Sequence, residues 1–336
     1  MSGNRKIYTI DDIAKELGVS KTTVSRSLSG KGRISKETRA RVMQFVETHE
    51  YRAEILAKAL KDTRSHNIGL LLPSMFIDTD FPFFRGCVKS VYEIASQENY
   101  DVMLAMAGGE NDISRLKEQV EKRKVDGVIV TRSTGDKSIV NLLQKQEMPF
   151  VVIGPTDDER ILSVDNRNRE GCRELTSLLL MKGIRRLALI GRSSTHRVTE
   201  CNKKGYQDAL RKYGVDENEK LIILDVENQE QVNAAVEQVV RIGADGILCM
   251  DDLLAVQALE ALKKRKIRVP TDMRLASCYD NEKLEKNFPP ITSVHFDTEE
   301  LGRSACRMLL DVIEGRTTKK KLPANYQVIL RESTKI

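Results

Sequence analysis

The sequence predicts a mixed α/β protein with a small helical head, followed by a core of two doubly wound parallel-sheet subdomains. In 10–46, apolar residues recur at helical spacing only. From residue 67 onward, short apolar runs alternate with helical patterns, which is typical of parallel sheets covered on both faces. A chain of 336 residues is long enough for two further domains after the head.

The excess positive charge is confined to the predicted head. Residues 1–66 contain 14 Lys and Arg against 8 Asp and Glu, whereas 67–336 contain 41 of each. A basic end on an otherwise neutral chain favours a polyanionic partner for that end, and DNA is the first candidate. The alternative is a solvated helical hairpin with scattered basic side chains.

The head has the spacing of a helix-turn-helix. Gly18 is suited to end a first helix, Ser20 to cap a second, and Ser35 to cap a third. The second helix of this motif enters the major groove, so its outward side chains are candidates for DNA contact. We expect base contacts from Lys21, Thr22 and Arg26. Positioning and phosphate contacts are expected from Thr9, Ser20, Thr23 and Ser25.

Several stretches together resemble the LacI/GalR-type transcriptional regulators, the lactose-repressor family. They are 9–28, 57–60, 125–129, 278–281 and 291–295. The resemblance covers essentially the whole chain and implies a periplasmic-binding-protein-like core. It implies three parts: a helix-turn-helix domain over 1–52, a hinge helix and linker over 53–66, and an effector-binding and dimerisation core over 67–336. In that core the first subdomain would comprise 67–165 and 296–323, and the second 166–295 and 324–336.

The resemblance makes Leu60 the leucine that wedges into the minor groove at the operator centre. The chain departs from the family just before it, because 52–54 reads Arg-Ala-Glu where the family has Asn-Pro or Ser-Pro. Losing the proline removes a stiff helix start. The alternative is that Leu56 and Leu60 form an ordinary core pair.

The core contains two similar stretches, 125–129 and 244–248, and each follows a charged helix and begins a strand. Two similar halves predict a cleft, with ligand at the carboxyl ends of the strands. Strand-end position and the resemblance together select the effector-binding candidates Phe83, Phe84, Arg132, Arg197, Asn202, Asp251 and Asp280.

These candidates have different expected roles. The aromatic side chains would stack on a sugar or base, and the aspartates would accept hydrogen bonds from hydroxyl groups. Asn202 stands where the family has an effector-binding arginine. Arg132 and Arg197 could grip a carboxylate or phosphate, which favours a sugar acid or sugar phosphate. The alternatives are a helix core for the aromatics, helix caps for the aspartates, and solvent-exposed loops for the arginines.

Other patterns argue against an enzyme, a metal site and a cofactor. The six cysteines show no Cys-x-x-Cys spacing and the four histidines no metal-ligand spacing. We find no nucleophile elbow or phosphate loop, so no catalytic residue is predicted. No signal peptide or membrane segment is recognisable, and the scattered cysteines suit a reducing cytoplasm.

We therefore expect a cytoplasmic, sequence-specific repressor of carbohydrate-utilisation genes. It would bind a palindromic double-stranded operator as a homodimer and respond to a sugar, sugar acid or sugar phosphate. No apolar heptads follow the last predicted strand, which favours a dimer over a tetramer. One alternative is a carbon-catabolite-type regulator controlled by a phosphoprotein at 299–307, through Arg303 and Arg307. The other is a sugar-binding protein without a DNA function.

Overall fold

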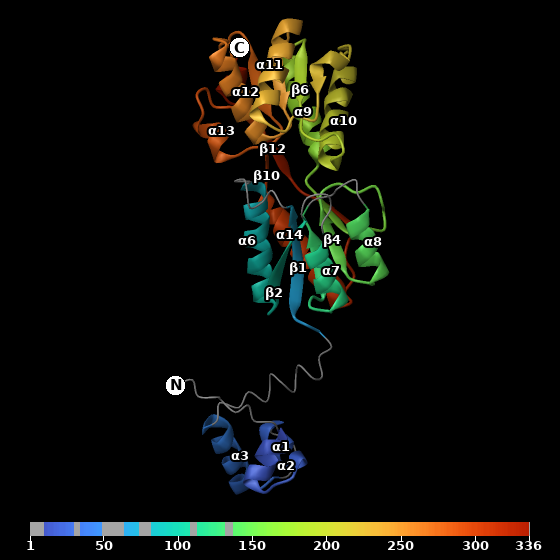
Figure 1. Ribbon diagram of the computed structural model, residues 1–336, viewed down its shortest axis with the longest axis vertical. Coiled ribbons are helices and arrows are strands. Elements are labelled where there is room, and N and C mark those ends of the chain that lie inside the picture. The colour runs from blue at the N-terminus through green and yellow to red at the C-terminus, as the bar shows by residue number, and fades with distance from the viewer. Residues whose placement is uncertain are drawn as a thin grey trace. The chain divides into compact units, whose positions relative to one another are not determined.

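The structure is a computed structural model that describes residues 10–29, 34–48, 64–73, 82–107, 113–131 and 137–335. The chain divides into two compact units, Met1–Ser65 and His66–Ile336 (Figure 1). Three residues singled out from the sequence, Thr9, Leu60 and Arg132, lie outside the described residues.

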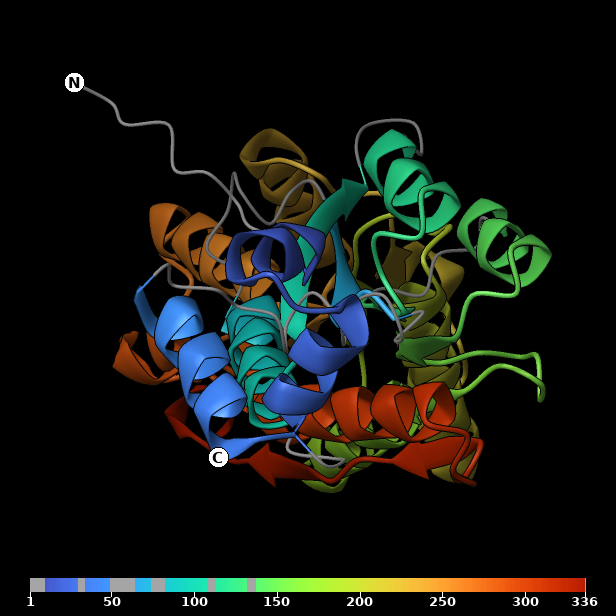
Figure 2. The same ribbon diagram turned by 90° about the horizontal axis from the view of Figure 1, so that it is seen from below.

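In its described residues, the first unit contains the helices α1 (Ile10–Leu17), α2 (Lys21–Ser29) and α3 (Lys36–Thr48) (Figure 2, blue). They share a small core of buried side chains: Ile13, Ala14, Val24 and Val42. Gly18 has a φ of +65°, the left-handed conformation that lets the chain turn between α1 and α2. The predicted helix-turn-helix geometry is thereby confirmed for this part of the chain.

The second unit contains two parallel-sheet halves. The first sheet has the strand order β11-β5-β4-β3-β1-β2, and all its pairs are parallel. Its strands are β1 (Asn67–Pro73), β2 (Asp101–Ala107), β3 (Gly127–Val130), β4 (Phe150–Ile153), β5 (Ser163–Asp165) and β11 (Lys321–Pro323). The helices that cover it are α6 (Pro82–Gln97), α7 (Ser114–Glu121), α8 (Ser138–Lys145) and α14 (Thr298–Ile313).

The second sheet repeats this arrangement with the order β12-β10-β9-β8-β6-β7, in which only β12 runs antiparallel to its neighbour. Its strands are β6 (Leu187–Ile190), β7 (Ile222–Ile223), β8 (Gly246–Cys249), β9 (Arg274–Ser277), β10 (Thr292–Phe296) and β12 (Tyr326–Ile329). The α-helices of this half are α9 (Asn168–Met181), α10 (Arg197–Lys212), α11 (Gln229–Ile242), α12 (Asp252–Lys264) and α13 (Glu282–Lys286).

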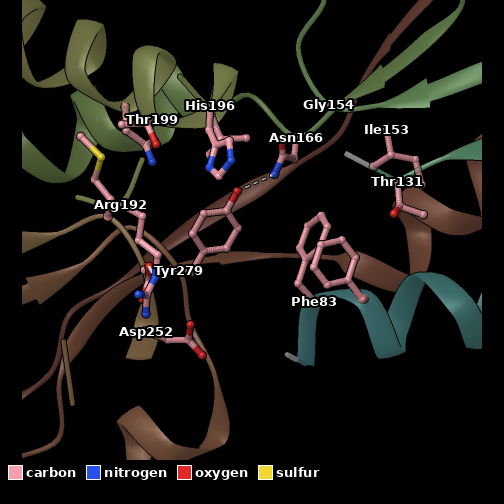
Figure 3. A pocket seen from close by; sticks show the side chains of 15 residues that line it. Phe83, Thr131, Ile153, Gly154, Asn166, Arg192, His196, Thr199, Asp252 and Tyr279 are labelled. Carbon is pink, nitrogen blue, oxygen red and sulfur yellow. Dashed lines mark hydrogen bonds and ion pairs between the residues drawn. The ribbon is translucent and has the colours of Figure 1, made fainter. Parts of the chain in front are cut away.

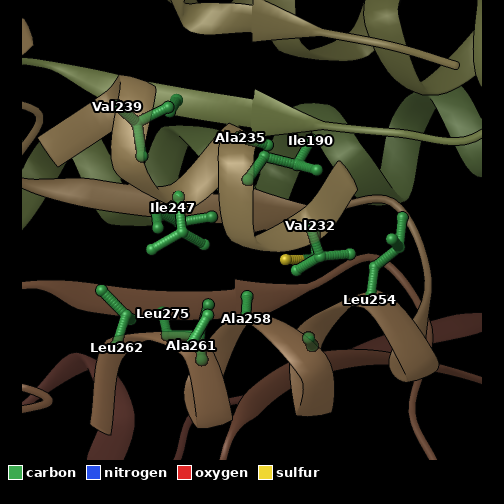
Figure 4. Close-up of a cluster of buried hydrophobic side chains, with 14 of the residues drawn as sticks. Ile190, Val232, Ala235, Val239, Ile247, Leu254, Ala258, Ala261, Leu262 and Leu275 are labelled. Carbon is green, nitrogen blue, oxygen red and sulfur yellow. The ribbon is translucent and has the colours of Figure 1, made fainter. Parts of the chain in front are cut away.

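The central strands of both sheets are buried on both faces, as their uninterrupted apolar runs predict. In the first sheet, Ile68 and Leu70 pack towards α6 and α14, whereas Leu71 packs towards α7 and α8. In the second sheet, Ile190 and its neighbours pack against α11 and α12 (Figure 4), whereas Leu189 faces α9 and α10. The predicted fold class of a helical head and two doubly wound halves is confirmed.

The chain passes from one half to the other between β5 and α9, between β10 and α14, and between β11 and β12. In each sheet the strand order reverses direction at the first strand, beside β3 in one half and β8 in the other. In doubly wound folds, ligands bind outside the carboxyl ends of the strands at this reversal. The strands β5 and β11 are only three residues long and carry little sequence pattern, so they were not predicted.

Candidate DNA-binding helix and ligand pocket

Helix α2 presents a polar face to solvent. Its inward side carries the buried Val24, while Lys21, Thr22, Ser25 and Arg26 are exposed. Their spacing of one and four residues places these exposed side chains on one side of the helix. This face could donate hydrogen bonds to base edges and phosphates.

The start of α2 is held by its predicted cap. The Ser20 hydroxyl accepts a hydrogen bond from the backbone N–H of Thr23 at 3.1 Å, and the two hydroxyls are 2.8 Å apart. Lys21 Nζ lies 2.6 Å from Asp11 Oδ2, and both side chains remain largely exposed. An exposed pair of this kind contributes little to stability, so Lys21 can exchange Asp11 for a phosphate or base at small cost.

A pocket of about 160 Å³ lies in the second unit, where the strands of both sheets end. Phe83, Phe84 and Ile153 contribute an apolar side from the first half. The second half contributes its polar side, Arg192, His196, Thr199, Asn202, Asp251 and Asp252. Figure 3 shows Tyr279 between these two sides, with its ring directed towards Phe83.

Tyr279 connects the pocket to both halves of the unit. Its ring meets that of Phe83 edge-on, with the centroids 5.9 Å apart. Its hydroxyl donates to Asn168 Oδ1 at 2.6 Å and accepts from Asn166 Nδ2 at 3.3 Å (Figure 3). Asn166 and Asn168 lie where the chain crosses from β5 to α9. A ligand that displaces Tyr279 would therefore act on a crossover between the halves.

Among its described lining residues, the pocket contains one arginine and two aspartates, and each of them has a partner within the chain. Arg192 Nε donates to Asp251 Oδ2 at 2.8 Å, and Asp251 Oδ1 caps α12 by accepting from Leu254 N at 2.7 Å. The neighbouring Asp252 accepts a hydrogen bond from the Asn281 side chain. Burial, and secondarily the charge of Asp251, raises the pKa of Asp252 from 3.8 to about 6.

Family models match both units. The model described as bacterial regulatory proteins, lacI family, matches residues 9–54, and that of a periplasmic binding protein-like domain matches 176–334. The transcriptional regulator RegA of Clostridium saccharobutylicum is 29% identical over 338 residues, which cover 97% of this chain and 99% of RegA. The chain belongs to the lacI family of bacterial transcriptional regulators.

Two further relatives bear on how this LacI-family regulator works. The solved complex of the transcriptional regulator CelR with cellobiose shares 27% identity and a TM-score of 0.74, covering 97% of this chain and 99% of CelR. Catabolite control protein A of Staphylococcus xylosus is 27% identical over 90% of this chain and 91% of its own length. The first of these relatives is named a transcriptional regulator and the second a catabolite control protein.

The structure brings four of the predicted effector-binding residues of this LacI-family chain into the pocket lining: Phe83, Phe84, Asn202 and Asp251. Asp251 also has the alternative role of capping α12. Arg132 lies outside the described residues. Whether the four contact an effector stays a prediction.

Arg197 and Asp280 do not line this pocket. Arg197 forms ion pairs with Glu200 on its own helix and with Asp157, so its guanidinium charge is neutralised outside the pocket. Asp280 accepts from Arg331 Nη1 at 2.7 Å and from Ser293 Oγ at 2.6 Å, with 9% of its side chain exposed. It faces an adjoining cavity of about 380 Å³. Asp280 was selected by the family resemblance and Arg197 for its positive charge near Asn202, but ion-pair partners direct both side chains elsewhere.

The lining residues of the LacI-family pocket that were not predicted from the sequence include Asn166, Arg192 and Tyr279. Each follows a strand of one of the sheets by one or two residues. The strand-end rule that selected Asp251 would have found all three if applied to every strand.

The predicted phosphoprotein patch over 299–307 is largely engaged within the chain. Arg303 lies within 4.0 Å of carboxylate oxygens of Glu93, Glu299 and Glu300, and 29% of its side chain is exposed. Arg307 on the same helix is exposed. The patch therefore has one accessible arginine and one that three carboxylates surround.

Within the described part of the chain, no group of His, Cys, Asp and Glu side chains could hold a metal ion. In the same ranges, no helix is both long and apolar enough to cross a membrane.

Proposed function

We propose that this LacI-family chain is a repressor of carbohydrate-utilisation genes, controlled by a small sugar-type metabolite. The observation that carries the proposal is the pocket at the strand ends of both sheets, in a chain whose first unit presents the exposed face of α2. We assign 1–52 to DNA binding, 53–66 to the hinge and linker, and 67–336 to effector binding and dimerisation. In this assignment the first subdomain is 67–165 with 296–323, and the second is 166–295 with 324–336.

In the proposed complex two copies present their α2 helices to the two halves of a palindromic operator, since a two-fold dimer matches a two-fold site. Lys21, Thr22 and Arg26 read bases, because their side chains are exposed on α2. Ser25 and the capped start of α2 hold phosphates. Leu60 is the proposed minor-groove wedge.

The proposed effector binds between the apolar side and the polar side of the pocket. Rings such as Phe83 and Tyr279 suit the carbon face of a sugar, while hydrogen-bonding groups suit its hydroxyls. The cellobiose complex of CelR supports a saccharide as the ligand class. Phe83 and Tyr279 come from different halves, so a ligand that touches both changes the angle between the halves.

We further propose that the chain has no enzymatic activity and acts in the cytoplasm. The two aspartates of its pocket are committed to other contacts, Asp251 to Arg192 and the start of α12, and Asp252 to Asn281. A protein that binds the chromosome works in the compartment that contains it.

Control by a phosphoprotein is the second candidate. It is supported by the similarity to catabolite control protein A and by the exposed Arg307 on α14. The ion pairs around Arg303 weigh against it, because a phosphate would have to displace carboxylates that already hold this arginine.

The test is fluorescence anisotropy with a labelled operator selected from random DNA by the full chain. We expect salt-dependent binding that one metabolite from a saccharide panel weakens or strengthens. Tight binding that no small molecule changes would favour the phosphoprotein candidate. Absence of sequence preference would contradict the proposal.

A further inference from the structure

The ligand pocket holds two hydrogen-bond donors without an acceptor. Arg192 Nη2 and Asn202 Nδ2 are shut off from solvent, and neither has a partner among the described residues. Asn202 is only 1% exposed, and both residues line the same pocket. Buried donors are rarely left unpaired, because they have lost water without a replacement. The two donors point to a ligand that brings oxygen acceptors.

Arg192 is held rigidly and its charge is already balanced. Nε donates to Asp251, and Nη1 donates to the carbonyl oxygens of Glu227 at 3.1 Å and Val226 at 3.4 Å. These bonds fix the plane of the guanidinium group, and only 14% of the Arg192 side chain is exposed. Nη2 therefore remains as an oriented donor on a group whose charge Asp251 neutralises.

The rest of the pocket adds no positive charge from lysine or arginine among the described lining residues. Asp252 is a second carboxylate beside Asp251, and Arg197 is paired outside the pocket. A carboxylate or phosphate on the ligand would be buried near two aspartates, and Arg192, the arginine among the described lining residues, is already paired. Burial of an uncompensated charge is strongly unfavourable.

We infer that the pocket selects an uncharged polyhydroxylated ligand, and that Arg192 and Asn202 determine this specificity by donating to its hydroxyl or ring oxygens. The inference rests on the proposed function, since it names the ligand class of the regulatory pocket. It replaces the sugar acid or sugar phosphate that the sequence favoured. Phe83 and Tyr279 supply the apolar surface for the carbon face of the same ligand.

The experiment compares sugars that share a skeleton and differ in charge, titrated calorimetrically into the full chain at pH 7.5. The pairs are maltose with maltobionate, cellobiose with cellobionate, and glucose with glucuronate and with glucose 6-phosphate. We expect at least one uncharged sugar to bind, and its charged counterpart to bind at least about tenfold more weakly.

Two variants separate the donor from the charge. Arg192→Lys keeps a positive charge but loses Nη2, so the uncharged sugar should bind about tenfold more weakly. Asp251→Asn keeps a good helix cap but leaves the charge of Arg192 unbalanced, so the preference for the uncharged sugar should narrow. Arg241→Lys, at an arginine that is 75% exposed outside the pocket, is the matched control. It should leave the affinities for the uncharged sugar and for its charged counterpart unchanged.

A charged sugar that binds as tightly as its uncharged counterpart would overturn the inference, as would unchanged affinity in Arg192→Lys. Failure of every uncharged sugar to bind a chain that still binds operator would also overturn it. Calorimetry needs no DNA, so sugar binding is measured independently of operator binding. A chain that binds an uncharged sugar but no operator would support the inference and count against the proposed function alone.

Discussion

At the residue scale, neighbours determine what each acidic group of the pocket can do. Asp251 and Asp252 are adjacent in the sequence, yet Asp251 pairs with Arg192 while Asp252 accepts from the Asn281 amide. Burial raises the pKa of Asp252 to about 6. Its carboxyl group therefore titrates in a range where most aspartates are fully ionised.

We predict that Asp252→Asn stabilises the second unit above pH 6. A raised pKa means that the folded state keeps a proton that the unfolded state has lost, so stability falls as the pH rises from about 4 to about 6. The asparagine variant does not lose stability in this way, so its free energy of unfolding above pH 6 should exceed that of the original chain by on the order of 2 kcal/mol. Urea unfolding of both proteins at pH 4.5 and pH 7.5 measures it. If the free energies of unfolding of the two proteins changed equally between pH 4.5 and pH 7.5, the prediction would be wrong.

Tyr279→Phe should destabilise the second unit by about 1–2 kcal/mol, because the buried Asn168 Oδ1 loses its 2.6 Å hydrogen bond and keeps only the 3.3 Å one from Asn166. The effector response should also weaken, since the hydroxyl ties the pocket to the crossover at Asn166. Thermal unfolding and operator titration measure the two effects. Tyr213→Phe, at a tyrosine that is 37% exposed, is the control. Equal behaviour of the two variants would refute a role for the Tyr279 hydroxyl.

At the element scale, α9 and α10 approach so closely that only a glycine fits between them. A Cβ atom at Gly205 would lie 2.3 Å from the backbone oxygen of Arg169 and 3.0 Å from the backbone nitrogen of Arg173. Backbone atoms cannot move aside as the end of a flexible side chain can. The second half of the core depends on this contact, because α10 also buries Tyr206 against the sheet.

Gly205→Ala should therefore destabilise the chain by about 2–3 kcal/mol through overpacking. The neighbouring Lys204→Ala removes only an exposed ion pair with Glu200 and should cost less than about 0.5 kcal/mol. Urea unfolding curves of the two variants make the comparison. A Gly205 variant as stable as the Lys204 variant would show that the helices can separate without cost.

The exposed face of helix α2 leads to a prediction about operator recognition. Arg26→Ala should weaken operator binding by about 1–3 kcal/mol and relax the preference at one base pair, if Arg26 reads a base. Lys15→Ala, which removes an exposed charge from α1, should weaken all DNA sequences about equally. Anisotropy titrations on the operator and on its single-base variants distinguish these outcomes. Uniform weakening by both variants would place Arg26 on a phosphate.

At the scale of the whole molecule, regulation requires that the pocket and the DNA-binding unit share one equilibrium. Linkage makes this testable, because an effector that changes operator affinity by some factor must have its own affinity changed by operator through the same factor. We predict equal factors, in the range of about 5 to 150 that is typical of such coupling. Effector titrations with and without saturating operator measure it, with unrelated DNA as the control. Unequal factors would mean that the effector acts outside this equilibrium.

The parts of this protein that depend on local pattern could be predicted from its sequence. Helical spacing around Gly18 and Ser20 was enough for the head, since a glycine turn and a serine cap act within a few residues. The alternation of apolar runs with helices was enough for two doubly wound sheets, because strands buried on both faces must be apolar throughout. The strand-end rule then brought Phe83 and Asp251 to the pocket.

Which strand-end residues face the pocket, and what charge they present, depends on how the elements pack together. Asp280 turns to Arg331, which is 51 residues away along the chain, and Arg197 turns to Asp157. Arg192 becomes part of the pocket because Asp251, 59 residues later, holds its guanidinium group. Such pairings depend on distances between elements that are remote in sequence, and no local pattern encodes them. Sequence pattern thus places residues on elements, and packing between elements chooses their partners.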